Sequence, residues 1–411
     1  MKKILLVNDF ERGGGAEEVF EATQELLIGK CIVKKFVGCE KHLEPLNYFS
    51  YIYSIENNGS SLSRIYSPER YKRFLHVLMD FTPDIVHLHN YYSFLSPSIL
   101  NAIRTYRKCG NRFRVIFTAH DFHLLCPYSS FMHYSLLSNR IHRLNDLPSV
   151  RQVFLSKWDE RGFPFSFMKK VQWIYAYQVK EFDKEIDCII TPSNFLTDLF
   201  KKKYKTIPVL TIRNPFVSME SIYSGAAVSR NRDGRTLRIV FGGRLSPEKG
   251  LIEFIHAIKE VTAFDVALKI IGEGPMEANI LKEIQEHKLL GKVVLAGRME
   301  HRSFLEELKR SDALVLPSIW HENAPLALVE GAFMNLRLIT ACYGGMKEMA
   351  EICGGEYLMD PQDGQNVRDV LARCYKDVSD EEPLRGRDMH ELRRIFSANS
   401  YLEKLIELYN D

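Results

Sequence analysis

The chain lacks the features that mark secreted, disulfide-stapled and membrane-spanning proteins. Its eight cysteines are scattered without a C-x-x-C pair or a regular spacing, so neither a disulfide framework nor a zinc ribbon is indicated. No apolar run reaches the length of about 18 residues that suggests a membrane-spanning helix. The start, MKKILLVNDF, also lacks the long apolar core of a signal peptide. We therefore expect a cytoplasmic protein with reduced thiols.

Strong charge of either sign and internal repetition are also absent. The 411 residues carry 55 Lys and Arg against 52 Asp and Glu, a formal net charge of +3, which is too small to indicate a nucleic-acid partner. At this length and with 45% hydrophobic residues, the chain exceeds one ordinary core, so two domains are expected. Segments typical of strands and helices alternate in both halves, which predicts the α/β class.

The most informative stretch is Trp320–Gly331, WHENAPLALVEG, which places Glu322 and Glu330 eight positions apart. The apolar run before it, Ser311–Ser318, predicts a buried parallel strand, and the residues from Pro325 onward predict a helix. Both carboxylates are then expected at the carboxyl end of a strand, where open parallel sheets bind ligands and where carboxylates can accept hydrogen bonds from sugar hydroxyls. Alternatively, Glu330 is a charge favoured by the helix dipole and Glu322 a solvated loop residue.

A second stretch, Ile239–Leu251, has the composition of an anion-binding turn. A strand predicted at Leu237–Phe241 leads into two glycines, Arg244 and Lys249, and a helix is expected directly afterwards. Glycines let the backbone approach a ligand, and two cations beside a helix amino end can hold a diphosphate without a metal. A simple strand-to-helix turn with exposed basic residues explains either cation alone, but it explains the whole combination less well.

Taken together, residues 239–345 resemble the carboxyl-terminal half of a GT-B glycosyltransferase of the retaining family 4 (group 1) type. The landmarks that carry the resemblance are, in order, GGRLSPEKG, IIGEGP, VVLAGRM, SDALVLPS and the E-x7-E arrangement that ends at Glu330. The resemblance implies two Rossmann-like doubly wound domains that face each other across a cleft. Residues 1–212 would bind the acceptor, residues 213–395 would bind the nucleotide-sugar donor, and the helix of residues 396–411 would cross back to the first domain.

The resemblance also implies residue roles. Arg244 and Lys249 would hold the donor diphosphate and stabilise its growing charge, Glu330 would bind the ribose, and Glu322 would lie near the donor sugar. The base would lie beside the backbone of Gly297, Arg298 and Met299. The remaining donor-binding candidates are Gly14, Gly15, Gly243, Asn323, Ala324, Pro325 and Leu326.

In the amino-terminal half, the strand predicted at Lys3–Phe10 leads into a glycine-rich loop that precedes an amphipathic helix. The loop contains Gly13, Gly14 and Gly15 but not the G-x-G-x-x-G pattern, so dinucleotide binding is weakly supported. The resemblance places this loop against the acceptor and the donor phosphates, with Gly13 on the acceptor side. The alternative is a structural turn of a common kind.

Two further predicted strands end in polar residues, within Asp84–Asn90 and Arg114–Pro127. His120 follows the second strand, and the resemblance makes it the residue near the donor sugar, a fourth catalytic candidate beside Arg244, Lys249 and Glu322. His89, Asn90 and Asp121 are further acceptor-side candidates. His120, His123 and Cys126 are metal ligands by type, but no fourth partner or rigid frame is indicated, so we expect no metal there.

The stretch Pro127–Lys203 mixes aromatic and basic residues. Such a surface suits anionic lipid headgroups or a large acceptor, because aromatic rings settle at a membrane interface and cations attract anionic lipid. The alternative is an insertion whose aromatic rings pack on the first domain.

We therefore expect a metal-independent, retaining glycosyltransferase without a cofactor. It would move a sugar from a nucleoside-diphosphate sugar to a hydroxyl of a glycan acceptor, linked to a polyprenyl diphosphate lipid, in O-antigen, capsule or exopolysaccharide synthesis at the inner face of the plasma membrane. The absence of a D-x-D motif disfavours a metal-dependent GT-A enzyme. Two alternatives stay open: a sugar-nucleotide epimerase, for which Asp121 is the one amino-terminal carboxylate in place, and a non-catalytic partner subunit.

Overall fold

The computed structural model describes residues 1–11, 13–39, 52–56, 61–136, 140–216, 235–384 and 386–411. The chain divides into two compact units. Unit 1 comprises Met1–Pro215 together with Ala398–Asp411, and unit 2 comprises Phe216–Ser397. The sequence placed its boundaries after residues 212 and 395, within a few residues of these divisions.

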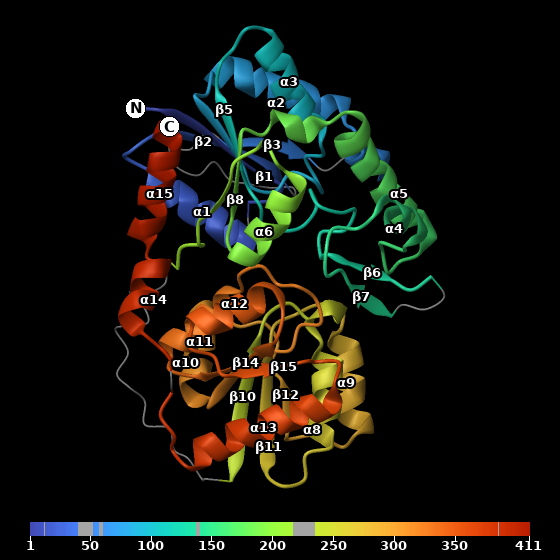
Figure 1. Cartoon of the computed structure of the whole chain (residues 1–411), viewed down its shortest axis with the longest axis vertical. Coiled ribbons are helices and arrows are strands. Elements are labelled where there is room, and N and C mark those ends of the chain that lie inside the picture. The colour runs from blue at the N-terminus through green and yellow to red at the C-terminus, as the bar shows by residue number, and fades with distance from the viewer. Residues whose placement is uncertain (12, 40–51, 57–60, 137–139, 217–234, 385) are drawn as a thin grey trace. The chain divides into compact units, whose positions relative to one another are not determined.

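Unit 1 is built on a parallel sheet of seven strands in the order β3-β2-β1-β4-β5-β8-β9 (Figure 1). The strands are β1 (Lys3–Asn8), β2 (Ile32–Cys39), β3 (Ile52–Glu56), β4 (Ile85–Leu88), β5 (Arg114–Thr118), β8 (Cys188–Thr191) and β9 (Val209–Thr211). Short strands β6 (Met132–Tyr134) and β7 (Ile141–Arg143) form a separate antiparallel pair. Because the strands of the large sheet are parallel, their carboxyl ends all meet at one edge.

Helices cover both faces of this sheet because successive strand residues point to opposite sides. Along β1, Ile4 and Leu6 join one apolar cluster, whereas Leu5 and Val7 join the other. The unit 1 helices are α1 (Gly15–Leu27), α2 (Pro68–Phe81), α3 (Ser98–Lys108), α4 (Val150–Leu155), α5 (Phe163–Ile174), α6 (Asn194–Lys203) and α15 (Ala398–Asn410), with shorter turns at η1 (Ser61–Arg64), η2 (Tyr175–Val179) and η3 (Phe182–Glu185). Ser193 caps α6 as expected, since its hydroxyl accepts the N–H of Leu196.

Unit 2 contains a second parallel sheet, of six strands in the order β12-β11-β10-β13-β14-β15. The strands are β10 (Thr236–Gly242), β11 (Asp265–Ile271), β12 (Val293–Leu295), β13 (Ala313–Leu316), β14 (Arg337–Ala341) and β15 (Tyr357–Met359). Around them lie the turn η4 (Pro247–Lys249) and the helices α8 (Leu251–Lys259), α9 (Glu277–Glu286), α10 (His301–Arg310), α11 (Leu326–Phe333), α12 (Gly344–Ile352), α13 (Gly364–Ser379) and α14 (Met389–Phe396). The expected α/β class with two Rossmann-like parallel sheets is confirmed.

The last helix, α15, belongs to unit 1 although it follows unit 2 in the chain. It begins at Ala398, two residues later than the sequence suggested, because α14 ends at Phe396 and Ser397 is extended. Figure 1 shows α15 beside α1, and Leu405 is fully buried in the apolar cluster that lies on this face of the sheet. Two tyrosine hydroxyls fix the helix: Tyr401 contacts the Thr23 hydroxyl at 2.7 Å, and Tyr409 contacts His87 Nδ1 at 2.6 Å.

None of the helices in the part of the chain that the structure describes combines the length and the apolar content that a membrane span requires.

The two tyrosines of α15 give a stability prediction. Tyr409→Phe should lower the free energy of unfolding by about 1–3 kcal/mol, because it leaves a ring nitrogen of the fully buried His87 without its partner. Tyr401→Phe is the matched control. Thr23 keeps its hydrogen bond to the Val19 carbonyl at 2.7 Å, so the loss there should stay below about 1 kcal/mol. Urea unfolding of both variants measures the difference, and equal losses would contradict the role given to His87.

Candidate functional site

Most residues that the sequence predicted to bind the donor lie in unit 2, in or directly after the loops at the carboxyl ends of β10, β12 and β13. The strands are parallel, so these loops share one edge of the sheet. Gly243, Arg244 and Lys249 follow β10, the segment Gly297–Met299 follows β12, and Glu322 with the start of α11 follows β13. The fold therefore gathers the predicted donor-binding residues at a single edge.

The loop after β10, residues 243–250, holds Arg244 and Lys249 and is called the cradle from here on. Hydrogen bonds join it to the loop after β11. Leu245 donates its N–H to the Glu273 carbonyl at 2.9 Å, and Met276 donates to the Leu245 carbonyl at 3.0 Å. Gly243 in turn donates to the Ile271 carbonyl at 3.0 Å. The IIGEGP segment and Met276 after it thus hold the cradle through backbone hydrogen bonds. In the sequence this segment was only a landmark of the family resemblance.

The other end of the cradle is locked to the loop after β13. Gly250 has a φ of +65°, and a Cβ at this position would lie 2.1 Å from the Pro317 carbonyl oxygen. Next to this contact, Ile319 donates its N–H to the Glu248 carbonyl at 2.9 Å. A glycine is required here both for its conformation and for the close approach of two backbones. This approach brings Lys249 to the loop that carries Glu322.

Lys249 and Glu322 form an ion pair, with Nζ 2.5 Å from Oε1. The Ser318 hydroxyl donates to the same carboxylate oxygen at 2.9 Å. Burial acts to raise the pKa of Glu322, but the charge and hydrogen bond of Lys249, together with the Ser318 hydroxyl, outweigh it and lower this pKa below its ordinary value. Glu322 is therefore ionised at neutral pH and already oriented by two partners.

Arg244 differs from Lys249 in having no such partner. Its side chain is exposed, and within the described residues its guanidinium makes no hydrogen bond or ion pair. An unpaired guanidinium can offer both arms of its planar fork to phosphate oxygens. At this edge of the sheet, Arg244 supplies positive charge that the protein itself does not neutralise.

Glu330 lies on α11, where its carboxylate is buried and contacts His301. His301 Nε2 is 2.7 Å from Glu330 Oε1, and His301 is the first residue of α10. Between β12 and α10, Gly297 accepts the N–H of Gly272 at 2.9 Å, and Arg298 is exposed. The sequence missed His301 because its partner is 29 positions away and no local pattern links the two residues.

The segment Asn323–Leu326 joins the β13 loop to α11, whose first residue is Leu326. It is supported by the start of α12, where a Cβ on Gly345 would lie 1.8 Å from the Asn323 carbonyl oxygen. Tyr343, just before α12, donates its hydroxyl to the Ser318 carbonyl at 2.8 Å. Sequence reasoning overlooked both supporting residues, which act on the backbone around Glu322.

In unit 1, the glycine loop after β1 ends at the start of α1. Gly14 is the N-cap of this helix, and its N–H donates to Glu17 Oε2 at 2.8 Å. Gly13, Gly14 and Gly15 are all exposed, and a Cβ on Gly15 would meet nothing within 4 Å. The glycines of the loop are therefore exposed, and the Glu17 carboxylate accepts the amide hydrogen of Gly14.

His89 and His120 lie together at the carboxyl ends of β4 and β5. His89 Nδ1 is 2.9 Å from His120 Nε2, and their rings stack with centroids 5.0 Å apart. Burial lowers the pKa of His120 to about 4 and, with help from the neighbouring histidines, lowers the pKa of His89 as well. Both rings are neutral at physiological pH. Asn90 follows directly, and its N–H donates to Asn8 Oδ1 at 2.8 Å.

Asp121 is tied to His123 rather than free. Its Oδ1 lies 2.5 Å from His123 Nδ1 and also accepts the His123 N–H at 2.9 Å. Burial acts to raise the pKa of Asp121, but the charge and hydrogen bonds of His123 outweigh it and lower this pKa. Cys126 is the third residue of this segment, after His120 and His123, whose type can bind a metal. Burial raises the pKa of its thiol to about 12, so the thiolate that a metal needs is disfavoured.

Comparisons with known proteins agree with this geometry. Residues 227–387, the segment that holds Arg244, Lys249, Glu322 and Glu330, match the family described as Glycosyl transferases group 1. An uncharacterized 42.6 kDa protein in the cps region of Klebsiella pneumoniae is 24% identical over 99% of each chain. WcaL of Salmonella typhimurium, assigned as a colanic acid biosynthesis glycosyltransferase, is 27% identical over 34% of this chain and 36% of its own.

Among solved structures, the Anabaena protein Alr3699/HepE in complex with UDP and glucose is similar over 100% of both chains, with a TM-score of 0.63 and 14% identity. The chain has the GT-B fold, and its residues 227–387 match the group 1 glycosyl transferase family. This confirms the resemblance inferred from the motifs of residues 239–345.

The contact at Gly345 yields a test of loop positioning. Gly345→Ala should lower transferase activity about tenfold or more, because the new Cβ would displace the backbone of Glu322 and Asn323. The matched control is Gly364→Ala at the start of α13, where the new Cβ would meet only the end of the Arg368 side chain, at 3.4 Å. Steady-state rates and unfolding midpoints should be measured for both. Equal rates in the two variants would remove Gly345 from the site.

Proposed function

We propose that this chain is a retaining glycosyltransferase that needs no metal for its reaction. It transfers a sugar from a nucleoside-diphosphate sugar to a hydroxyl of a glycan acceptor carried on a polyprenyl diphosphate lipid, in the synthesis of a surface polysaccharide. The observation that carries the proposal is that Arg244, Lys249 and Glu322 in loops, and Glu330 on the helix α11 that follows the Glu322 loop, all lie at one edge of the unit 2 sheet.

The proposed donor contacts follow from the partners of the charged side chains at this edge of the sheet. Arg244 is exposed and has no side-chain partner among the described residues, so it can bind the diphosphate first. Lys249 is neutralised by Glu322 until a phosphate competes for it. Glu322 would then accept hydrogen bonds from sugar hydroxyls, and Glu330, oriented by His301, from the ribose. The Anabaena structure, solved with UDP and glucose, supports a donor of this class.

In the proposed reaction, the bond between the anomeric carbon and the diphosphate oxygen breaks while a glycosidic bond forms on the same face. The proton of the acceptor hydroxyl passes to the leaving phosphate, whose negative charge Arg244, Lys249 and the amino end of α8 stabilise. No cation other than these side chains is then needed at the diphosphate. His120 would act as a neutral hydrogen-bonding group rather than as an acid, because burial keeps its pKa near 4.

The epimerase alternative is weakened by the state of Asp121. An epimerase needs a carboxyl group that can give and take protons, whereas Asp121 is held ionised by two hydrogen bonds from His123. The partner-subunit alternative predicts loss of the cradle, yet Arg244, Lys249, Glu322 and Glu330 are all in place.

A donor screen with cradle variants tests the proposal. Incubation with a panel of nucleoside-diphosphate sugars should release nucleoside diphosphate only when a glycan acceptor is present, and EDTA should leave the initial rate unchanged. Arg244→Ala and Lys249→Ala should each raise the barrier by about 2–4 kcal/mol, because each removes charge stabilisation from the leaving group. Arg310→Ala, on the exposed end of α10, serves as the control.

Each other outcome has a definite meaning. Conversion of the donor sugar without an acceptor would indicate an epimerase, and no turnover with any donor would favour the partner subunit. Loss of the rate in EDTA, restored by manganese or magnesium, would overturn the metal-free reaction.

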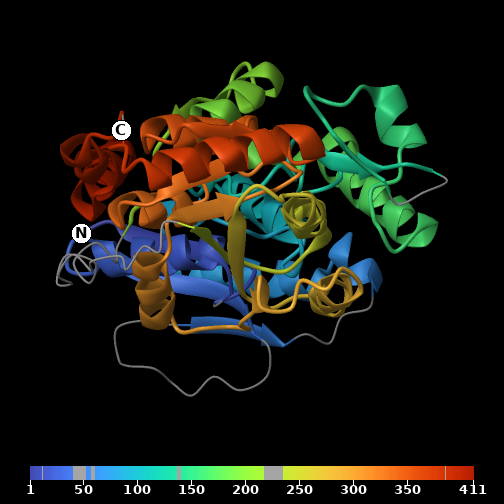
Figure 2. The ribbon, with the colours of Figure 1, turned by 90° about the horizontal axis from the view of Figure 1, so that it is seen from below.

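The proposal of a lipid-linked acceptor rests on the stretch Pro127–Lys203, whose large apolar residues divide into two groups. One group packs in the unit 1 core and is buried: Phe131, Tyr134, Trp158, Trp173 and Tyr177. The other apolar side chains, on α4 and α5, are exposed: Val150 at 75%, Phe154 at 58%, Leu155 at 58%, Phe163 at 60% and Phe167 at 67%. Figures 1 and 2 show these two helices next to each other, and Lys170 of α5 donates to the Phe154 carbonyl of α4 at 2.6 Å.

Positive charge accompanies the exposed apolar side chains. Arg151 on α4 is exposed, and Arg161 and Lys169 share a single carboxylate, Asp159, at 2.9 Å and 3.0 Å. Five large apolar groups with a net positive charge suit the interface of an anionic bilayer, where rings lie among the headgroups. We assign this surface of α4 and α5 to reversible membrane contact beside the acceptor.

Liposome sedimentation tests the membrane contact. Binding should rise with the fraction of anionic lipid and fall with salt, because surface charges are screened over about 8 Å at physiological ionic strength. Phe163→Ser combined with Phe167→Ser should release the protein from the vesicles. Leu290→Ser, at a position of unit 2 that is 74% exposed, is the control and should not. Absence of binding by the unchanged protein would point to a soluble acceptor instead.

A further inference from the structure

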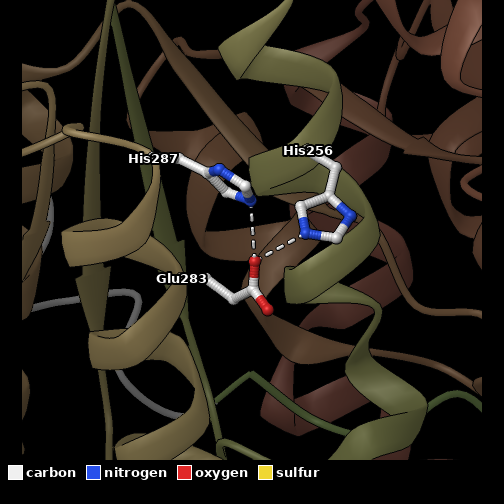
Figure 3. A group of neighbouring side chains, drawn as sticks. All are labelled: His256, Glu283 and His287. Atoms are coloured by element: carbon white, nitrogen blue, oxygen red, sulfur yellow. Dashed lines mark hydrogen bonds and ion pairs between the residues drawn. The ribbon is translucent and has the colours of Figure 1, made fainter.

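Three side chains on the surface of unit 2 form a cluster that the transferase reaction does not use. His256 lies on α8, Glu283 lies on α9, and His287 directly follows α9 (Figure 3). One carboxylate oxygen, Glu283 Oε2, lies 2.7 Å from His256 Nε2 and 3.1 Å from His287 Nε2. Both imidazoles therefore point their Nε2 atoms at the same point.

The sequence and the helix packing together produce this convergence. Glu283 and His287 are four residues apart, so they lie on the same face of the helix end. His256 comes from the neighbouring helix, because Ile255 of α8 and Ile284 of α9 are buried in the same apolar cluster. The two histidine rings meet edge to face, with their centroids 5.4 Å apart. The site thus spans two helices whose packing is fixed by the core.

Its chemistry is that of a transition-metal site. Two imidazole nitrogens and one carboxylate oxygen suit Zn²⁺, and three protein ligands leave a fourth position for water. Within the part of the chain that the structure describes, these are the three ligand-type side chains whose donor atoms all lie within 4.8 Å of one another. A hydrogen bond from His256 lowers the pKa of the Glu283 carboxyl group.

A metal ion can reach the cluster from solvent. The side chains of His256, Glu283 and His287 are 51%, 22% and 25% exposed. Coordination needs both imidazoles neutral with their Nε2 lone pairs free, so the protons now shared with Glu283 would move to Nδ1 or to solvent as the metal binds.

We propose that His256, Glu283 and His287 bind a Zn²⁺ ion that clamps α8 to α9. The two helices that the ion would join both adjoin the cradle. Helix α8 begins at Leu251, directly behind Lys249, and α9 follows the loop whose residues Glu273 and Met276 hold Leu245. An ion joining the two helices stabilises the scaffold of the donor cradle without touching the donor. It is a structural site, and its presence leaves the metal-free reaction unchanged.

The test uses the full chain, freed of any histidine tag, stripped with EDTA and titrated with Zn²⁺ by calorimetry. Unchanged protein should bind one Zn²⁺ per chain and unfold at a higher temperature when zinc is present. Glu283→Gln keeps the size and hydrogen-bonding ability of the side chain but removes its charge, and His287→Ala removes a ligand. Each should weaken zinc binding by at least about tenfold and abolish the thermal shift.

His390→Ala, another exposed histidine of unit 2, is the matched control and should behave like the unchanged protein. Circular dichroism of each variant establishes that it has folded. Absence of zinc binding in the unchanged protein, or equal binding in Glu283→Gln, would overturn the proposal. Transferase rates in the same samples keep the two proposals apart, since zinc binding without turnover contradicts only the proposed reaction, and turnover without zinc binding contradicts only the clamp.

Discussion

Direct backbone packing between consecutive loops at the carboxyl edge of the unit 2 sheet is the constraint on which the candidate site depends. Because the strands are parallel, the loops that follow them share one edge of the sheet, and there they contact one another. The turn before α8 lies against the Pro317 carbonyl, and the loop after β11 is hydrogen-bonded to Leu245. Backbone contacts are more rigid than contacts between long side chains, because they carry no rotamer freedom. They therefore fix the starting points of Arg244, Lys249 and Glu322, and only the side-chain tips stay adjustable.

Unit 1 reaches a similar rigidity by another route, which depends on the last residues of the chain. Tyr409 of α15 bonds His87, and the other ring nitrogen of His87 lies 2.7 Å from the Thr118 hydroxyl. The ring of His87 also lies against that of His89, which is bonded to His120. Burial holds the pKa of His87 at about 3, so this row of rings is uncharged and can be enclosed at little electrostatic cost. Helix α15 thus supports His89 and His120 through a line of hydrogen bonds and ring contacts.

The features that the sequence predicted are those that depend on residues close together in the chain. Apolar runs located β10 and β13 to within two residues, the start of α8 was predicted at Leu251, and the cap at Ser193 is present as expected. The ion pair between Lys249 and Glu322, which are 73 positions apart, was not predicted, because the family resemblance assigned the two residues only to separate parts of the donor. His301, which contacts Glu330, was missed because it depends on how two helices start at one sheet edge. The division of aromatic residues in Pro127–Lys203 was equally inaccessible, since burial is decided by tertiary packing and the composition of α5 resembles that of its buried neighbours.

The pairing of the candidate residues with one another has a physical reason. A poorly solvated carboxylate without a partner would take up a proton or distort its surroundings, so the contact with Lys249 keeps Glu322 charged. The contact with His301 fixes the direction of the Glu330 side chain. In the proposed reaction, a bound diphosphate competes with Glu322 for Lys249, which frees the carboxylate for the sugar hydroxyls. Lys249 exchanges one anionic partner for another, and Glu322 exchanges a cation for neutral hydroxyl groups, so the net gain in binding is modest. A phosphate without a sugar would leave the part-buried Glu322 with the Ser318 hydroxyl alone, and a sugar without a phosphate could not displace Lys249. The exchange therefore favours a ligand that carries both groups, which is the defining property of a nucleoside-diphosphate sugar.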